Sequence, residues 1–327
     1  MNYKDNKIML SKRGFIFLIE HSRVKIENGV LVYLKAENGV YKSYNIPYIN
    51  TSLIMIGEGS SITRDAAAII SDSGTLLMFV GGGGSPLHSC GDLSFSVISP
   101  VSEYRPTQYM QNWAKIFFDE DVRLKAAKDF MNFRIDNIIY YYNKIDFVQE
   151  MGVVFTNKDE KILEYRKKIA VAKNVNELLL SEAWFTKFLY STFAKIIKLN
   201  SFTREQGKRS DENDLDIINS MLDHGNYIMY GLGSVTLHGF GISYAFPLLH
   251  GKTRRGALVF DVADLVKDAI CLPLAFYSAI NGFKDNEFRR RLIFNINQYK
   301  ILDRLFLQVK EIATKDFYAQ NSDSIKM

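Results

Sequence analysis

The chain has 327 residues, of which 47% are hydrophobic and 24% charged, and its formal net charge is +5. It is long enough for two domains with separate cores, and its mild basic excess permits an anionic partner without demanding one. The sequence contains two cysteines, Cys90 and Cys271, too few for a disulfide framework, and we expect buried free thiols. The apolar run at residues 15–19 is too short for a signal peptide or a membrane span. We therefore expect a cytoplasmic protein with no membrane partner.

The first hundred residues carry the pattern of β-strands. Two Asn-Gly pairs, at 28–29 and 38–39, each lie between runs of β-branched and aromatic residues. Because Asn-Gly favours positive φ at both turn positions, this spacing predicts three strands joined by two-residue turns. The apolar runs Leu53–Ile56 and Thr75–Val80 predict two further strands.

One helix is expected between these last two strands, within residues 60–74. Ser61 or Thr63 can cap its N-terminus, and Gly74 can end it. Four glycines follow at 81–84, but no Lys-Ser/Thr pair comes after them and Pro86 interrupts the segment. We interpret them as a permissive turn and not as a phosphate-binding loop.

The next part of the chain has the pattern of helices. No proline occurs between Pro106 and Pro247, and apolar residues recur at helical spacing from Trp113 onward. We therefore predict an α+β protein, with a β-rich domain over residues 1–100 and an all-α domain over residues 101–327.

One segment, residues 201–214, interrupts the helical pattern. It is polar and charged and has little to bury, which is typical of a mobile surface loop. Its cations Arg204, Lys208 and Arg209 either contact an anion or are simply solvated, and the pattern does not decide between the two.

The stretch LLHGKTRRGALVFDVADLVKD, residues 248–268, combines cations and acids with an apolar pattern. Residues Phe260–Leu272 fit a helix, on which Asp261, Asp264 and Asp268 fall within an arc of about 60° at the edge of the apolar face. Three carboxylates on so narrow an arc repel each other unless something cationic compensates them.

Two kinds of compensation fit this stretch. One is ion pairing with Lys252, Arg254 and Arg255, and the other is a divalent metal bound by the acids together with His250. Carboxylates with one imidazole suit Mg²⁺ or Mn²⁺, and flanking cations suit a phosphodiester substrate. Glu182, within LLLSEAWFTKFLY, is either a further ligand from another helix or an ordinary surface acid. Spacing alone leaves both alternatives open.

The longer motifs resemble a known family. LLHGKTRRGALVFDVADLVKD, LLLSEAWFTKFLY and LDHGNYIMYGLGS, with GEGSSITRDA, VGGGGSPL and SEYRPTQY in the first half, resemble the CRISPR-associated spacer-acquisition integrases called Cas-one, and most closely their type I-F (Ypest) subtype. The resemblance covers nearly the whole chain. It implies an N-terminal β-sandwich-like domain that forms a homodimer, followed by a helical catalytic domain.

The resemblance also implies site residues. Glu182, His250 and Asp264 match the metal ligands of the family, and Asp261 matches a second acid near the metal, where it would order a water or act as a further ligand. Asp268 matches the subtype pattern but has no metal role, so we expect it to be a helix-surface or pairing residue.

Other candidates receive no catalytic role. Asn226, Tyr227 and Tyr230 resemble a family core motif, but their order departs from it, so neither tyrosine is assigned to catalysis. His224 and His238 match no metal ligand and are expected to be structural.

The function implied is that of a metal-dependent DNA integrase and endonuclease. The 3′-hydroxyl of a prespacer fragment would attack a phosphodiester of the CRISPR repeat, and water in its place would cut branched or single-stranded DNA. Lys252, Arg254 and Arg255 are candidates for holding phosphates. The implied partners are a second copy and the small adaptation subunit called Cas-two, which in this subtype is fused to a helicase-nuclease. The alternative is a non-catalytic DNA-binding adaptor subunit of a nuclease complex.

Overall fold

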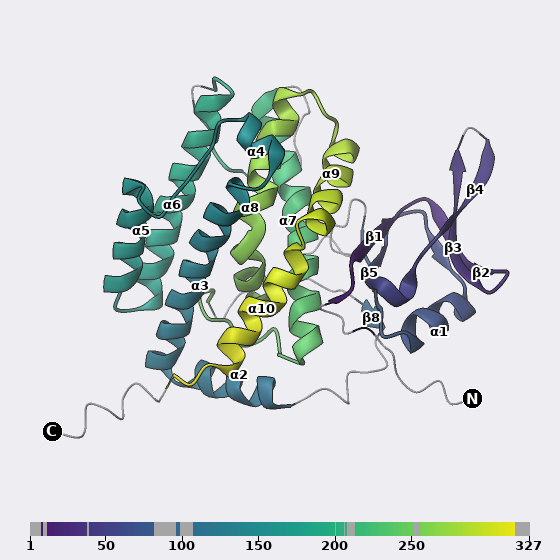
Figure 1. Ribbon diagram of the computed structural model, residues 1–327, viewed down its shortest axis with the longest axis horizontal. Coiled ribbons are helices and arrows are strands. Elements are labelled where there is room, and N and C mark those ends of the chain that lie inside the picture. Colours follow the sequence, from purple (N-terminus) through teal and green to yellow (C-terminus); the bar gives the residue numbers. More distant parts are fainter. Residues whose placement is uncertain are drawn as a thin grey trace. The chain divides into compact units, whose positions relative to one another are not determined.

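The computed structural model describes residues 8, 12–37, 39–81, 96–98, 107–199, 201–205, 207, 213–251 and 256–317. The chain divides into two compact units (Figure 1): residues 1–105 with 293–303, and residues 106–292 with 304–327. The sequence placed the division at residue 100 and gave the first domain no C-terminal segment. A local pattern cannot assign a distant segment such as 293–303, because its membership is decided by packing.

The first unit contains two four-stranded sheets. One has the order β1-β5-β7-β8 and the other β4-β3-β2-β6. The strands are β1 (Phe15–Ile19), β2 (Ser22–Glu27), β3 (Val30–Glu37), β4 (Val40–Asn45), β5 (Thr51–Ile56), β6 (Ser61–Ile62), β7 (Leu76–Phe79) and β8 (Ser96–Ile98). Strands β1, β5 and β7 are parallel neighbours, whereas β2, β3 and β4 form the antiparallel meander that the two Asn-Gly pairs predict.

The turn chemistry follows the sequence. Asn28 and Gly29 have φ values of 50° and 78°, both positive as a two-residue hairpin turn requires. Gly39 likewise has a φ of 78°, while Asn38 lies outside the described residues. The predicted strands at Leu53–Ile56 and Thr75–Val80 correspond to β5 and β7.

Helix α1 (Arg64–Asp72) packs on this part of the chain. Thr63 caps it by accepting a hydrogen bond from the backbone N–H of Ala66 at 3.3 Å, and Gly74 follows its end with a φ of 73°. Ser61 belongs to β6. The helix therefore begins at Arg64, inside the predicted range 60–74, and Thr63, not Ser61, is its cap. The hydrophobic core of this region is built from apolar residues of five strands, of α1 and of the position just after β4, namely Ile19, Val24, Leu31, Ile46, Ile54, Ile56, Ala66, Ile70 and Leu77. The glycines at 82–84 lie outside the described residues.

The second unit is helical in its described residues, as predicted. Its helices are α2 (Gln108–Phe118), α3 (Glu120–Tyr142), α4 (Asp146–Glu150), α5 (Glu160–Val171), α6 (Val175–Ile196), α7 (Asp214–Phe240), α8 (Ala257–Ile280), α9 (Asp285–Gln298) and α10 (Ile301–Thr314). The end of α9 and the start of α10 belong to the segment 293–303 of the first unit. Among the described residues, no helix is both long and apolar enough to cross a membrane. Cys271 is a buried free thiol, as expected, whereas Cys90 lies outside the described part of the chain.

Helix α8 is the central helix of this unit, between α3 and α7 (Figure 1). The sequence predicted it over Phe260–Leu272, but it begins at Ala257 and continues through Pro273 to Ile280. Proline removes one backbone donor, and a helix buried along most of its length is stabilised enough by its packing to continue past that loss.

Two glycines allow α7 to approach α8 closely. A Cβ atom added at Gly233 would lie 2.7 Å from the backbone oxygen of Val259, and one added at Gly225 would lie 2.2 Å from Sγ of Cys271. Both distances are shorter than van der Waals contact, so a larger residue at either position forces the two helices or their side chains apart. These two helices carry most of the candidate site.

Candidate active site

Helix α8 presents the three aspartates of the sequence motif, and all three are buried. Asp261 is 1% exposed, Asp264 6% and Asp268 3%. The sequence placed them at the edge of an apolar stripe, but α8 is covered on several sides by α3, α4, α6 and α7. Buried carboxylates need partners. Each aspartate has a different one, so the three have different tasks.

Asp261 holds the segment that precedes α8. Its Oδ2 accepts hydrogen bonds from the backbone N–H of Leu248 at 2.7 Å and of Leu249 at 3.1 Å. Its Oδ1 accepts one from the backbone N–H of His250 at 3.2 Å and lies 2.5 Å from Nδ1 of the same residue. Both oxygens are therefore occupied by the protein. This arrangement makes Asp261 an anchor for residues 248–250 and an orienting partner for the imidazole.

His250 is held in one orientation by this contact. With Nδ1 directed at Asp261, the other ring nitrogen, Nε2, is the one that can serve a ligand. Burial by itself lowers the pKa of His250, but the hydrogen bond and charge of Asp261, with smaller contributions from Asp264 and Glu182, outweigh it and raise the pKa above its ordinary value. The His250 side chain is 17% exposed, so it remains accessible from one side.

Asp264 is paired with Lys267, one turn further along α8. The Lys267 Nζ atom lies 2.5 Å from Oδ1 of Asp264. Burial raises the pKa of Asp264 and the nearby Glu182 raises it further, while the Lys267 ammonium opposes both. Burial opposes the charge of Lys267, but Asp264 and Asp268 more than offset this and raise its pKa. Lys267 is thus a resident cation beside a carboxylate that would otherwise be isolated.

Glu182 and Asp268 share a buried arginine that the sequence did not single out. Arg134, from α3, donates from Nη1 to Oε1 of Glu182 at 2.6 Å, from Nε to Oδ2 of Asp268 at 2.7 Å, and from Nη2 to the same Oδ2. Burial works to raise the pKa of Glu182, but Arg134 and then Lys267 outweigh it and lower this pKa to about 2. Glu182 is therefore ionised, and Asp268 is a pairing residue, one of the two roles expected for it.

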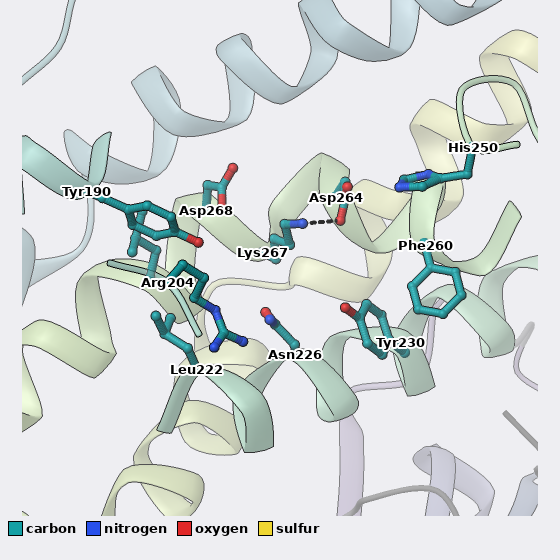
Figure 2. Close-up of a pocket in the computed structure, with 11 residues that line it drawn as sticks. Tyr190, Arg204, Leu222, Asn226, Tyr230, His250, Phe260, Asp264, Lys267 and Asp268 are labelled. Atoms are coloured by element: carbon teal, nitrogen blue, oxygen red, sulfur yellow. Dashed lines mark ion pairs between the residues drawn. The ribbon is translucent and has the colours of Figure 1, made fainter. Parts of the chain in front are cut away.

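Of these groups, His250, Asp264, Lys267 and Asp268 line a polar pocket of about 130 Å³ (Figure 2), whereas Asp261, Glu182 and Arg134 are not part of its lining. The polar residues that line it come from α6, the segment after it, α7, the segment before α8, and α8 itself: Tyr190, Arg204, Asn226, Tyr230, His250, Asp264, Lys267 and Asp268. In Figure 2, the Asp264–Lys267 pair and His250 lie on one side, facing Arg204, Asn226 and Tyr230 on the other. A second pocket, of about 350 Å³, also includes His250 in its lining.

The predicted ligand set fits a divalent ion in kind. Two carboxylates and one imidazole suit Mg²⁺ or Mn²⁺, and both Glu182 and His250 influence the pKa of Asp264, so the three groups share one electrostatic neighbourhood. Oδ1 of Asp264 is buried and accepts no hydrogen bond from the described residues, its partner there being the charge of Lys267. Within those same residues, however, no three acidic, histidine or cysteine side chains are already positioned around one ion. Arg134 and Lys267 hold the carboxylates that an ion would need.

The remaining sequence candidates fall into two groups. Lys252, Arg254 and Arg255 lie outside the described residues. Tyr230 lines the pocket with Asn226, while His224 pairs with Asp285 at 2.6 Å, a structural contact of the kind expected.

The sequence missed two cations of this site and left the role of a third open. Lys267 could have been found, because it lies three residues after Asp264 and so one turn away on the same helix. Arg134 offered no such signal, since it is 134 residues from its partner Asp268. Arg204 was seen as a cation, but its polar surroundings suggested a mobile loop.

Comparison with known proteins identifies the family. Residues 16–293 match the sequence model of the family described as "CRISPR associated protein Cas1". The chain is 38% identical over 312 residues to a protein of Pectobacterium atrosepticum and 36% identical over 312 residues to one of Pseudomonas aeruginosa. Both are named CRISPR-associated endonuclease Cas1, and the matches cover 94% of this chain with 94% and 95% of the relatives. The chain therefore belongs to the Cas1 family of endonucleases and integrases, as its motifs indicated.

Solved structures share the fold. "Crystal structure of TtCas1" matches with a TM-score of 0.67 at 17% identity, covering 93% of this chain and 99% of that one. "Casposase bound to integration product" matches with 0.67 at 15% identity, over 93% and 92%. A chain of a "Cas6-RT-Cas1--Cas2 complex" matches with 0.60 at 13% identity, over 95% of this chain and 36% of that longer one. The predicted α+β architecture, strands first and helices after, is confirmed.

Proposed function

We propose that the protein is a metal-dependent DNA integrase and endonuclease that inserts new spacer DNA into a CRISPR array. The observation that carries this proposal is the polar pocket, where a buried acid, Asp264, and an oriented imidazole, His250, face a second wall with one cation, Arg204, and one amide, Asn226 (Figure 2). Membership in the Cas1 family supports it, as do the two relatives named as endonucleases and the structural neighbour described with an integration product.

The ligands that we propose for Mg²⁺ or Mn²⁺ are Glu182, His250 and Asp264. When bound, such an ion polarises a phosphoryl oxygen and lowers the pKa of an attacking hydroxyl. What supports this set is its chemistry: a glutamate ionised at neutral pH, an imidazole with Nε2 available, and a buried carboxylate whose Oδ1 has the Lys267 ammonium as its partner.

The protein's own residues prepare this arrangement. Asp261, for which the sequence suggested a ligand or water-ordering role, is instead proposed as a positioning residue, because its oxygens are taken by the backbone N–H groups of 248–250 and by the His250 ring. Arg134 fixes the direction of the Glu182 carboxylate from within the helical unit. Lys267 balances Asp264 and stands beside the place where the charge of a phosphate would enter.

The reaction conserves phosphodiester bonds. The attacking 3′-hydroxyl loses its proton as its oxygen bonds to phosphorus, the original ester bond breaks, and the departing 3′-oxygen takes up a proton. One bond replaces another, so strand transfer needs no external energy source. With water as the nucleophile, the same site would hydrolyse branched or single-stranded DNA.

The partners are proposals of the same kind. DNA would be held by many phosphate contacts, with Lys252, Arg254 and Arg255 as candidates next to the site. A homodimer and a complex with the small adaptation subunit are expected of the family, and the neighbour described as a Cas1–Cas2 complex supports the latter. The cytoplasm, where DNA lies within reach, is the expected location.

Strand transfer on a supercoiled plasmid that bears a repeat tests the proposal. The partner subunit and a prespacer are supplied, with Mn²⁺ or with EDTA, to wild type, to Asp264→Asn and to Asp136→Asn. Asp136 is an acid of α3, 44% exposed at its side chain and outside the pocket lining, so its variant is a matched control. Metal-dependent joining lost in Asp264→Asn alone supports the proposal. Joining that survives both EDTA and this substitution contradicts the site. DNA binding without any joining by wild type favours the non-catalytic adaptor.

A further inference from the structure

The segment between α6 and α7 is tied to α7 by its backbone and by one arginine. Asn219, on α7, accepts the backbone N–H of Glu205 at 3.0 Å and donates to the carbonyl oxygen of Thr203 at 3.0 Å. Asp223, one turn later, accepts the backbone N–H of Gly207 at 3.1 Å. The described part of this segment is therefore anchored, although its polar sequence suggested a mobile loop.

Arg204 adds further hydrogen bonds between this segment and α7, and these bonds fix its direction. We call Arg204, Asn219 and Asp223, with the backbone groups that they bind, the clamp. Its Nη2 donates to Oδ1 of Asp223 at 2.5 Å, and its Nη1 donates to Oδ1 of Asn219 at 3.2 Å and to the carbonyl oxygen of Glu205. The Arg204 and Asp223 side chains are 15% and 19% exposed, so the pair is largely shielded from water. Three of the five N–H donors of the guanidinium are used in this way, and two have no partner among the described residues.

The clamp places Arg204 in the wall of the pocket, opposite the Asp264–Lys267 pair (Figure 2). Asn226 follows Asp223 by three residues on α7 and lines the same wall, and its amide makes no hydrogen bond with the described residues. Tyr190 adds a hydroxyl from α6, and burial raises the pKa of this phenol to about 12, so it stays a neutral donor near pH 7. Arg204, Asn226 and Tyr190 thus bring one cation and two neutral donor groups to the pocket lining.

The acids near the pocket each have a cationic partner. Asp223 is paired with Arg204 itself and Asp264 with Lys267, while Asp268 shares Arg134 with Glu182. An incoming anion therefore meets carboxylates that are each in contact with a cation. A pocket of about 130 Å³ has room for one phosphodiester group.

We propose that Arg204, held by Asp223 and Asn219, binds a phosphodiester of the DNA that lies next to the reacting phosphodiester. Asn226 and Tyr190 are further donors to it. This inference rests on the proposed function and deepens it, because it assigns a strand-positioning residue that the sequence motifs do not contain. A guanidinium whose direction is fixed in advance loses little freedom when the phosphate arrives, and it can offer two parallel hydrogen bonds.

The test combines a protein variant with a DNA substrate in which one phosphate is made neutral. Wild type, Arg204→Gln and Arg204→Lys are compared on prespacers and repeat DNA that carry one neutral methylphosphonate at a time near the reacting bond. Arg166→Gln is the matched control, because Arg166 pairs with Asp136 at 2.6 Å and does not line the pocket.

On unmodified DNA, Arg204→Gln should lower kcat/KM for strand transfer by about 10- to 100-fold, the loss typical of one charged hydrogen bond. At one methylphosphonate position, wild type should slow by a similar factor, and Arg204→Gln should show no further loss. Arg204→Lys keeps the positive charge but cannot donate two parallel hydrogen bonds, so its kcat/KM should lie between those of wild type and Arg204→Gln. Arg166→Gln should behave as wild type. If no position shows this coupling, or if the control loses as much activity, the proposal is overturned.

A binding measurement separates this proposal from the function on which it rests. The affinity for a short single-stranded oligonucleotide is measured as a function of salt, without catalysis. Removing one phosphate contact should reduce the slope of log K against log[salt] by about 0.7. A reduced slope for Arg204→Gln supports the phosphate contact even if wild type joins no DNA. An unchanged slope contradicts it even if joining is robust.

Discussion

Arg134 and Asp268 form an ion pair inside the helical unit, in which the guanidinium donates from both Nε and Nη2 to a single carboxylate oxygen. Their side chains are 3% and 4% exposed. The same guanidinium also donates to Glu182 and to Thr186, both on α6. One buried cation from α3 therefore connects α6 with α8, the two helices that supply the candidate acidic ligands.

Replacing this cation should destabilise the protein strongly. Arg134→Met leaves Glu182 and Asp268 buried without their partner, and breaking such a pair from one side costs about 3–5 kcal/mol in free energy of unfolding. Urea unfolding followed by circular dichroism measures it. Arg166→Met removes a more exposed ion pair and should cost less than about 1 kcal/mol. Adding Asp268→Asn to Arg134→Met should recover part of the loss. Equal costs for Arg134→Met and Arg166→Met would contradict this account.

Asp261→Asn should loosen residues 248–250 without unfolding the unit. The amide side chain has one acceptor oxygen where the carboxylate has two, so it cannot accept all of the backbone N–H groups and orient His250 as well. We expect a cost of about 1–3 kcal/mol and faster hydrogen exchange at the amides of Leu248 and Leu249. Asp146→Asn, at an exposed acid in the first turn of α4, is the control. Unchanged exchange at Leu248 and Leu249 would show that Asp261 is not their anchor.

The raised pKa of His250 should depend chiefly on Asp261. Since the folded-state pKa lies above the ordinary 6.5, this contact contributes stability that is fully present below pH 6.5 and is lost as the pH rises through the folded-state pKa. An NMR titration of the five histidines, with His250→Gln to assign the signal, should give a midpoint above 6.5 in wild type. In Asp261→Asn, burial remains and the largest opposing contribution is lost, while the smaller ones of Asp264 and Glu182 persist, so the midpoint should fall. A midpoint that does not move on this substitution would contradict Asp261 as the group that raises the pKa of His250.

Adding a methyl group between α7 and α8 should be costly in a way that depends on the neighbouring atom. Gly233→Ala meets the backbone oxygen of Val259 and should destabilise by about 1–3 kcal/mol, despite the better helix propensity of alanine. Gly225→Ala meets the side chain of Cys271, so Cys271→Ala should relieve much of its cost. Thermal unfolding of the single and double variants, with Gly251→Ala as a control in open space, distinguishes the two cases. A neutral Gly233→Ala would mean that the helices can separate freely.

Local chemistry in the sequence predicted much of the fold. The Asn28-Gly29 turn, the Thr63 cap and the helices after Trp113 each follow from residues close together in the chain. The boundaries were less certain, because tertiary packing carries α8 through Pro273, where helix propensity alone would end it.

The candidate site was predicted less completely. Spacing on one helix brought Asp261, Asp264 and Asp268 together, but it could not show which partner each would find. The task of Asp261 depends on backbone N–H groups that no side-chain pattern reveals, and that of Asp268 depends on Arg134 in a distant helix. The metal itself, and the roles of Lys252, Arg254 and Arg255, stay predictions.

The cations built into this site also bear on how the protein matures. Arg134 and Lys267 already balance the acids that would receive an ion, so these buried carboxylates have counter-charges before any ion binds. Small metal-dependent domains behave differently, because the free energy of metal binding supplies their free energy of folding. If the proposed ion binds here, folding and metal loading would be separate events. The chain would then persist in a stable resting form when the ion is scarce, and its activity would follow the supply of the ion without a cycle of unfolding and refolding.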